Sequence, residues 1–207
     1  MAGVGVTRPA SALPALIAQR VAASTGRPVH VVSHAQAGAR TQDVLVKQLA
    51  LDLGKPDVVV LLVGTNDVTH MSPTRQLAGD TALVLSRLHS IGAPVVMSSL
   101  PEFGAMRAVP PLLRTALRTR AALVGRIHRR AVLEAGGGVN LVDVRGLLGR
   151  EFLTDPSLVS PDRFHPSRAG YSRIADVLAP AVIAAVTPDA DSRVISNPSL
   201  VSLGGAA

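Results

Sequence analysis

Asp162 and His165 stand three residues apart in the stretch DRFHPSRAGY. Histidine is the side chain whose ordinary pKa best suits taking up and returning a proton near neutral pH. It does so best when a carboxylate bonds its other ring nitrogen and sets its tautomer. Pro161 and Pro166 stiffen the loop, so we expect Asp162 to fold back onto His165. The spacing is typical of a general base with its orienting acid, although ordinary polar loops before helices also contain it.

A second group of residues could stabilise negative charge. The sequence GTND, residues 64–67, directly follows the apolar run 58–63, and Gly38 lies in the loop SHAQAGAR. The Asn66 amide and the Gly38 backbone N–H could donate to a developing oxyanion. We expect Asp67 to brace its turn rather than to act directly. The simpler alternative is an ordinary turn, because Asn and Asp tolerate turn geometry.

The elements that must position these residues alternate apolar runs with amphipathic stretches, as in an α/β layered fold. We expect N-caps at Thr41, Ser72 and Ser167. The polar candidates follow strands, and ligands of open parallel sheets sit at the carboxyl ends of strands. The expected strands span residues 29–33, 57–63, 95–99 and 139–144, and the expected helices span residues 13–23, 41–53, 72–90, 112–134 and 168–186.

The start of the chain departs from this alternation. A right-handed α/β unit expects a strand before the first helix, but MAGVGV leads almost directly into the helix at 13–23. We therefore expect the first strand of the fold to be missing from this chain. At the other end, residues 187–207 are small and polar, and we expect a disordered tail.

Composition narrows the possible functions. The 207 residues suit one domain, and the absence of cysteine excludes disulfides and thiolate catalysis. The net charge of +7 would suit nucleic acid, but three phenylalanines and one tyrosine are too few for a base-stacking surface. We therefore expect no nucleic-acid partner. The arginines of helix 112–134 indicate a solvated face, with a membrane-surface face as the alternative.

The remaining candidates for chemistry are weaker. Ser98 and Ser99 follow a strand but lack the GxSxG nucleophile elbow. The other histidines show no metal-ligand spacing, so we expect packing or surface roles and neither a metal nor a cofactor. These histidines are His30, His34, His70, His89 and His128.

Together these residues resemble the SGNH, or GDSL-type, hydrolases. The resemblance rests on a strand followed by G-T-N-D and, about a hundred residues later, on D-x-x-H-P-S-x-x-G-Y opening the last helix. It implies a flavodoxin-like α/β/α domain with a parallel sheet over residues 1–186, and hydrolysis of carboxylic esters. It further implies that Asp162 and His165 belong to a catalytic triad, that Gly38 and Asn66 form the oxyanion hole, and that Gly64 supports it.

The first sequence block of that family, G-D-S-x-x-A-G-V-G, is incomplete in this chain. Residues 2–5 and the Leu13-Pro14 pair match the second half of the pattern, which places the nucleophilic serine and its strand just upstream of Met1. We expect the 207 residues alone to be poorly stable and inactive. A start assigned too late or a truncation is one explanation, and a degenerate gene is the other. Turnover by these residues alone would direct attention to Ser11, Ser33 or Ser98.

The implied substrate is a small-molecule ester, which includes lipids and acylated carbohydrates. The alternative is an inactive protein of the same fold that binds an acylated sugar or lipid. Membrane association and location in the cell would depend on the residues before Met1.

Overall fold

A sheet of three parallel strands lies at the centre of the computed structural model, which describes residues 8–187. The strands β1 (Val59–Leu61), β2 (Val95–Ser98) and β3 (Val139–Val142) are hydrogen-bonded in the order β1-β2-β3. Strands covered on both faces read as continuous apolar runs, and β1 and β2 do so. The expected α/β fold with a parallel sheet is confirmed.

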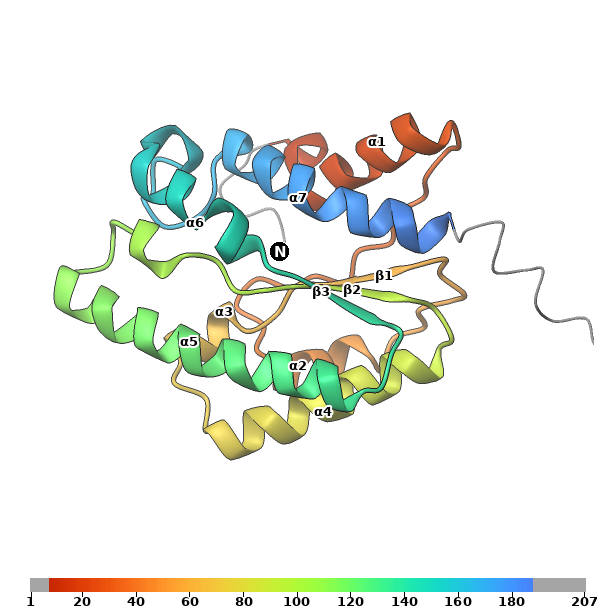
Figure 1. Ribbon diagram of the computed structural model, residues 1–207, viewed down its shortest axis with the longest axis horizontal. Helices are drawn as coiled ribbons and strands as arrows, with labels where there is room; N and C mark the ends of the chain where they lie inside the picture. The colour runs from red at the N-terminus through yellow and green to blue at the C-terminus, as the bar shows by residue number, and fades with distance from the viewer. Residues whose placement is uncertain (1–7, 188–207) are drawn as a thin grey trace, which may run out of the picture.

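Helices cover both faces of this sheet (Figure 1). One layer holds α1 (Leu13–Thr25), α6 (Val144–Thr154) and α7 (Arg168–Val186). The other holds α2 (Thr41–Asp43), α3 (Thr65–Thr69), α4 (Thr74–Ser90) and α5 (Pro111–Glu134). Short helical turns complete the fold: η1 (Pro9–Ser11), η2 (Val44–Gln48), η3 (Phe103–Ala105) and η4 (Pro156–Leu158). The result is the three-layer α/β/α arrangement.

Alternate residues of the apolar run that contains β1 pack into two separate cores, because successive side chains of a strand point to opposite faces of the sheet. Val58, Val60 and Leu62 pack against the cluster formed with α1 and α7. Val59 and Val63 pack on the opposite side, against the cluster with α4. The apolar run predicted as a buried strand therefore joins both layers, although the ladder itself covers only Val59–Leu61.

Residues 29–33 do not form the strand that the sequence predicts. These residues make no hydrogen bond to any other residue within 8–187. Their valines are partly exposed, at 38%, 42% and 63% for Val29, Val31 and Val32. A strand exists only with a neighbour that accepts and donates its backbone hydrogen bonds. Valine-rich sequence alone therefore misled the prediction.

The helix expected over residues 41–53 is also wrong in extent. It begins at Thr41 with Arg40 as the N-cap, continues as a π-helical turn, and ends at Gln48. The side chain of Asp52 accepts a hydrogen bond from the Gly54 N–H at 2.8 Å, and such local bonding competes with a helix. Thr41 is inside the helix, and its hydroxyl group bonds elsewhere, as described below.

Two more boundaries differ from expectation. Pro73, and not Ser72, is the N-cap of α4. The third strand ends at Val142 because Asp143 caps α6 and accepts a hydrogen bond from the Gly146 N–H at 3.0 Å. The sequence analysis did not expect α6. Helix 112–134 is confirmed as α5, and one of its arginines, Arg118, pairs at 2.9 Å with the buried Glu102.

The last helix has the predicted bounds, and Ser167 caps it by accepting a hydrogen bond from the Gly170 N–H at 3.2 Å. α7 is long and apolar enough to cross a membrane. However, Ile174, Leu178 and Val182 are buried in the core shared with α1, which is what a core helix does. The predicted tail at 187–207 lies outside the described residues except for Thr187.

The backbone of Leu158 packs so closely against the start of α7 that position 170 requires glycine. A Cβ at Gly170 would lie 2.1 Å from the backbone oxygen of Leu158, whereas a Cβ at Gly79 of α4 would meet nothing within 4 Å. We expect Gly170→Ala to lower the free energy of unfolding by about 1–3 kcal/mol through overpacking. Gly79→Ala should raise it by about 0.5–1 kcal/mol because alanine is the better helix former. Urea unfolding of both variants tests this, and shifts of the same sign would contradict it.

Candidate active site

The loop between η4 and α7 brings Asp162 and His165 together as the sequence predicts. The His165 Nδ1 lies 2.7 Å from Asp162 Oδ2. The loop is closed by backbone hydrogen bonds from Ser160 N to His165 O at 2.8 Å and from Arg163 N to Ser160 O at 2.9 Å. Arg163 takes a positive φ of 56° to make this reversal. The pair is therefore held by a short, internally bonded loop.

The Asp162 carboxylate accepts three further hydrogen bonds through Oδ1. They come from the Ser160 hydroxyl at 2.6 Å, the Phe164 N–H at 2.8 Å and the His165 N–H at 2.9 Å. Burial alone would raise the pKa of Asp162, but the bonds from Ser160 and His165 outweigh it and hold that pKa well below its ordinary range. The group is thus a carboxylate at any working pH and orients the imidazole.

The imidazole of His165 presents its other nitrogen, Nε2, for proton transfer. The side chain is 35% exposed and lines a cavity of about 890 Å³. The ring of Phe164 packs edge-on against it, with 5.0 Å between the ring centroids. With Nδ1 bound to a carboxylate, Nε2 can take a proton from a hydroxyl group and return it.

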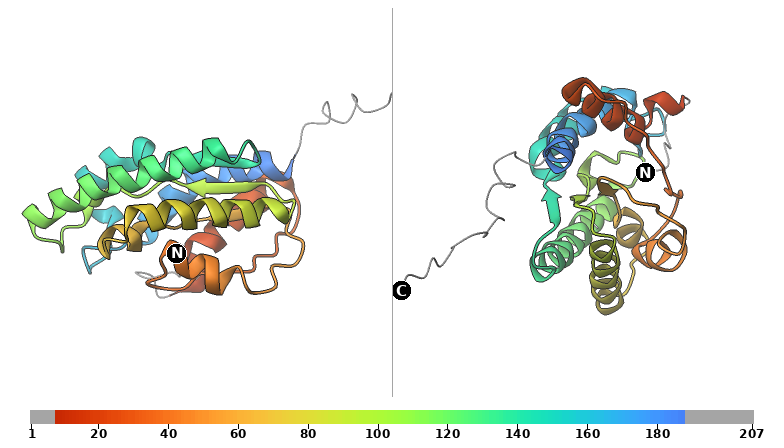
Figure 2. Two further views of the ribbon diagram at one scale, coloured as in Figure 1. Left: turned by 90° about the horizontal axis from the view of Figure 1, so that it is seen from below. Right: turned by 90° about the vertical axis from the view of Figure 1, so that its right-hand side faces the viewer.

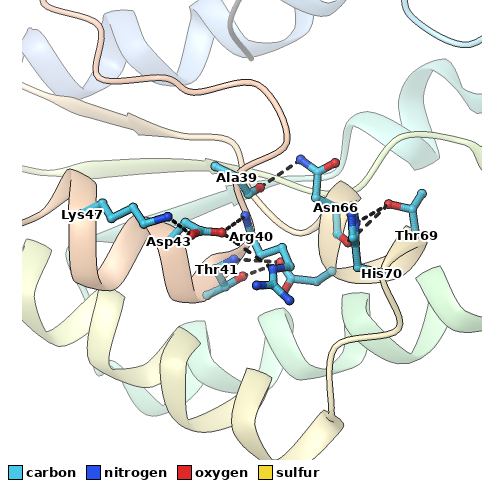
Figure 3. Close-up of polar contacts among 9 residues, drawn as sticks. Ala39, Arg40, Thr41, Asp43, Lys47, Asn66, Thr69 and His70 are labelled. Atoms are coloured by element: carbon cyan, nitrogen blue, oxygen red, sulfur yellow. Dashed lines mark hydrogen bonds and ion pairs between the residues drawn. The ribbon is translucent and has the colours of Figure 1, made fainter.

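Gly38 and Asn66, which carry the two expected oxyanion donors, line the same cavity as His165. Figure 3 shows that the Asn66 side chain reaches the Gly38 loop, where its Nδ2 donates to the Ala39 carbonyl oxygen at 2.9 Å. One amide N–H is used there, and no bond from the second is found within residues 8–187. Gly38 has a φ of 77°, which a residue with a side chain rarely adopts.

Asp67 bonds a residue far from it in the sequence, Thr41. Its carboxylate is buried and accepts hydrogen bonds from the Thr41 N–H at 2.9 Å and from the Thr41 hydroxyl at 2.8 Å. It therefore ties Thr41, in the segment that follows Gly38, to the segment that carries Asn66. The segments that carry the two candidate oxyanion donors are therefore joined by three hydrogen bonds.

Gly64 is required by space as well as by conformation. Its φ is 105°, and a Cβ there would lie 2.6 Å from the His128 ring and 2.9 Å from Leu100. His128 is 1% exposed, and neither of its ring nitrogens has a hydrogen-bond partner among the described residues. Burial lowers the pKa of His128 to about 4, against the opposing effect of the Asp67 charge. The turn that contains Gly64 and Asn66 therefore packs against the neutral imidazole of His128.

None of the serines within residues 8–187 hydrogen-bonds the His165 ring. Ser98 donates instead to the Ser99 carbonyl oxygen at 2.8 Å, and Ser99 donates to Asp143 at 3.2 Å. Over the same range, no three histidine or acidic side chains are grouped to hold a metal ion. The sequence analysis missed Ser160, Thr41 and His128 as supporting residues. Of these three residues, only Ser160 could have been predicted from the sequence, because it lies two residues before Asp162.

Comparison with known proteins agrees with this geometry. Residues 1–173 match the model of the GDSL-like lipase/acylhydrolase family. The chain belongs to this family. It is 34% identical over 187 residues to the GDSL-like esterase Rv1075c of Mycobacterium tuberculosis, covering 89% of this chain. It spans only 59% of the length of that relative.

Solved structures of hydrolases share the fold. The α/β hydrolase LAE5 from the metagenome of Lake Arreo superposes with a TM-score of 0.67 at 23% identity, covering 90% of this chain and 88% of its own. The acetyl xylan esterase AlAXEase gives a TM-score of 0.68 at 20% identity, covering 88% and 94%. At these identities the likeness concerns the fold.

The bond between Thr41 and Asp67 should matter for stability. Thr41→Val keeps the shape but removes the hydroxyl donor to a buried carboxylate, so we expect a loss of about 1–3 kcal/mol in the free energy of unfolding. Thr115→Val is the matched control, because the Thr115 hydroxyl is exposed and bonds only its own helix at 3.2 Å. It should change stability by less than about 0.5 kcal/mol. Equal losses of stability for Thr41→Val and Thr115→Val in urea unfolding would contradict a stabilising role of the bond between Thr41 and Asp67.

Buried His128 should make stability depend on pH. Its folded-state pKa of about 4 lies below the ordinary 6.5, so the unfolded chain binds the proton first as the pH falls. Stability should therefore be constant above about pH 7 and fall between about 6.5 and 4, at about 1.4 kcal/mol per pH unit. His128→Leu should remove roughly 2 kcal/mol of the loss between pH 7.5 and 5, whereas His89→Leu, an exposed site, should not. Parallel pH profiles for both variants would contradict this.

Proposed function

We propose that this GDSL-family chain forms the catalytic part of a serine-type hydrolase of carboxylic esters. The observation that carries the proposal is the His165–Asp162 pair, joined at 2.7 Å, beside a cavity that Gly38 and Asn66 also line. A general base, its orienting carboxylate and two donors for an oxyanion are the groups that acyl transfer needs. The esterase relatives support the same reaction.

In the proposed reaction, a serine hydroxyl carried upstream of Met1 attacks the carbonyl carbon of the ester. His165 Nε2 takes the hydroxyl proton, and the carbonyl oxygen gains the negative charge. The Gly38 N–H, the free N–H of Asn66 and the serine N–H stabilise that oxyanion. The protonated imidazole then gives its proton to the leaving alkoxide, which departs as an alcohol. Water repeats the sequence on the acyl-serine, releases the acid and restores the serine.

The arrangement of Asp162 favours catalysis over simple binding. A binding pocket needs donors and apolar walls, but it does not need an imidazole with one nitrogen bound to a carboxylate that accepts four hydrogen bonds. Such bonding selects one tautomer and leaves the other nitrogen as an acceptor for a proton. An inactive binder of an acylated sugar or lipid would gain nothing from this.

Hydrolysis of p-nitrophenyl acetate by two forms of the protein tests the proposal. One form is the 207-residue chain, and the other is the same chain extended by the residues encoded in frame before Met1. The extended form should turn over with a burst of nitrophenol, and the 207 residues alone should not exceed the buffer rate. His165→Gln in the extended form should reduce kcat by about 10⁴-fold, and Asn66→Ala by about 10²–10³-fold.

The exposed His89 provides the matched control, since His89→Gln should leave kcat unchanged. Full activity in the His165→Gln variant would contradict the assignment of the base. Turnover by the 207 residues alone would contradict the assignment of the nucleophile.

A further inference from the structure

Glu102 is a buried carboxylate that pairs with two arginines from different helices. It lies between β2 and η3, and its side chain is only 5% exposed. Its Oε1 lies 2.9 Å from Arg118 Nε of α5, and its Oε2 lies 3.0 Å from Arg145 Nε of α6. The Gly104 N–H donates to Oε1 at 2.8 Å and helps to fix the carboxylate. One carboxylate therefore holds two guanidinium groups beside each other.

These charges lie at the end of the molecule where α5 begins. Figure 2 shows α6 and the first turns of α5 at this end, and η3 contacts both helices. Glu102 packs on α6 so closely that a Cβ at Gly149 would lie 3.6 Å from its own Cβ. Glu102 also lines the cavity that contains His165. The two arginines therefore adjoin that cavity through Glu102.

Both arginines keep unused hydrogen-bond donors. Each pairs with Glu102 through Nε, and within residues 8–187 the terminal nitrogens Nη1 and Nη2 of these two side chains donate to no other residue. The side chains of Arg118 and Arg145 are 49% and 36% exposed, so a dissolved ion can reach them. A guanidinium group donates hydrogen bonds in a planar fork that matches the oxygens of an anion. The two arginines thus offer one anion two sets of free donors.

The charges around Glu102 do not balance. Its single negative charge faces the positive charges of its two partners, and a third arginine lies close by. Arg107 Nη2 donates to the Leu153 carbonyl oxygen at 3.2 Å. The Leu153 side chain and Arg118 Nε both approach the position that a Cβ of Gly104 would take, at 2.8 Å and 3.5 Å. Three arginines and one glutamate therefore leave an excess of two positive charges.

Within residues 8–187, no second acid pairs with these arginines. Asp143 caps α6 and makes no ion pair among the described residues, and Glu151 pairs with Arg173 at 2.8 Å. One arginine would suffice to neutralise Glu102, so a purely structural ion pair does not require the second. Excess positive charge held at fixed positions attracts an anion. The arrangement therefore favours a binding site over a structural link alone.

We propose that Arg118 and Arg145, held by Glu102, bind a phosphate group. A phosphate monoester carries about −1.5 to −2 elementary charges near neutral pH and has three acceptor oxygens. It can therefore engage both guanidinium forks and balance the excess charge, whereas a carboxylate has one charge and two oxygens. Free phosphate and the phosphate of an ester or a lipid headgroup share this chemistry. The site does not depend on the proposed function, because no step of ester hydrolysis enters the argument.

Isothermal titration calorimetry with inorganic phosphate, at an ionic strength held constant with sodium chloride, tests the site. We expect saturable one-to-one binding to the 207-residue chain, or to the extended form if the shorter chain aggregates. Combining Glu102→Gln, Arg118→Gln and Arg145→Gln removes both forks without leaving an unpaired buried carboxylate. This triple variant should bind phosphate at least about tenfold more weakly. Equal binding by the triple variant would overturn the proposal.

Arg126→Gln is the matched control for net charge. Arg126 is exposed on the same helix, two turns after Arg118. The triple variant loses two positive charges and one negative charge, so both proteins lose a net charge of one. Arg126→Gln should bind phosphate as the unaltered chain does. Equal weakening in the control and the triple variant would show that overall charge attracts the ion, and would overturn the site.

Circular dichroism shows whether the triple variant folds. If it does not, Arg145→Gln replaces it, because Arg118 still neutralises Glu102 there, and phosphate binding should again weaken. Sodium acetate provides a second titrant for the unaltered chain. Acetate should bind at least about tenfold more weakly than phosphate, since it cannot engage both forks. Equal affinities for acetate and phosphate would contradict the proposed ligand class.

Vesicle flotation distinguishes a lipid headgroup from free phosphate. The probes are phosphatidylcholine vesicles with and without phosphatidic acid, whose headgroup is a phosphate monoester. Flotation only with phosphatidic acid, lost in the triple variant and retained by Arg126→Gln, would identify a lipid source. Calorimetric binding without flotation would identify soluble phosphate, and both results support the site. Absence of variant-sensitive binding in both assays would overturn it, and neither assay depends on ester hydrolysis.

Discussion

Backbone groups inside an α/β/α fold need hydrogen-bond partners. Among residues 8–187, the free edge of β1 is where a neighbouring strand is not found. β1 lies between two helical layers, and the Val60 side chain packs into the core beneath α1 and α7. On its other edge, the backbone faces a groove rather than a strand. The valine-rich residues 28–35 line the same cavity and are irregular, since they make no hydrogen bond to another residue within 8–187. Within residues 8–187, the free edge of β1 thus accounts for the short sheet and for the unformed strand at residues 29–33.

The candidate site is well ordered despite this gap because it depends on other contacts. Asp162 and His165 are held by hydrogen bonds within residues 160–165. The oxyanion donors are held by contacts between two loops, from Asn66 to Ala39 and from Thr41 to Asp67. None of these bonds involves residues 28–35. The proposed general base and the proposed oxyanion donors are therefore held by contacts that do not depend on the free edge of β1.

Much of this could be read from the sequence, and the reasons differ from residue to residue. The Asp162–His165 contact was predictable because three residues and two prolines leave a short loop few alternatives. α5 and α7 were predictable from long apolar periodicity, and the cap at Ser167 from its residue type. The strand at residues 29–33 was predicted wrongly, since β-propensity cannot report whether a partner is present. The sequence also failed to predict α6 and the bond from Thr41 to Asp67. That bond joins residues 26 positions apart, which local sequence patterns cannot report.

The site of covalent labelling tests the proposed function most directly. The chain extended upstream of Met1 would be treated with a fluorophosphonate, digested and analysed by peptide mass spectrometry, with His165→Gln as the unreactive control. The proposed function predicts one adduct, on a serine in the segment encoded before Met1. An adduct on Ser11, Ser33 or Ser98, abolished by the same His165→Gln change, would contradict it.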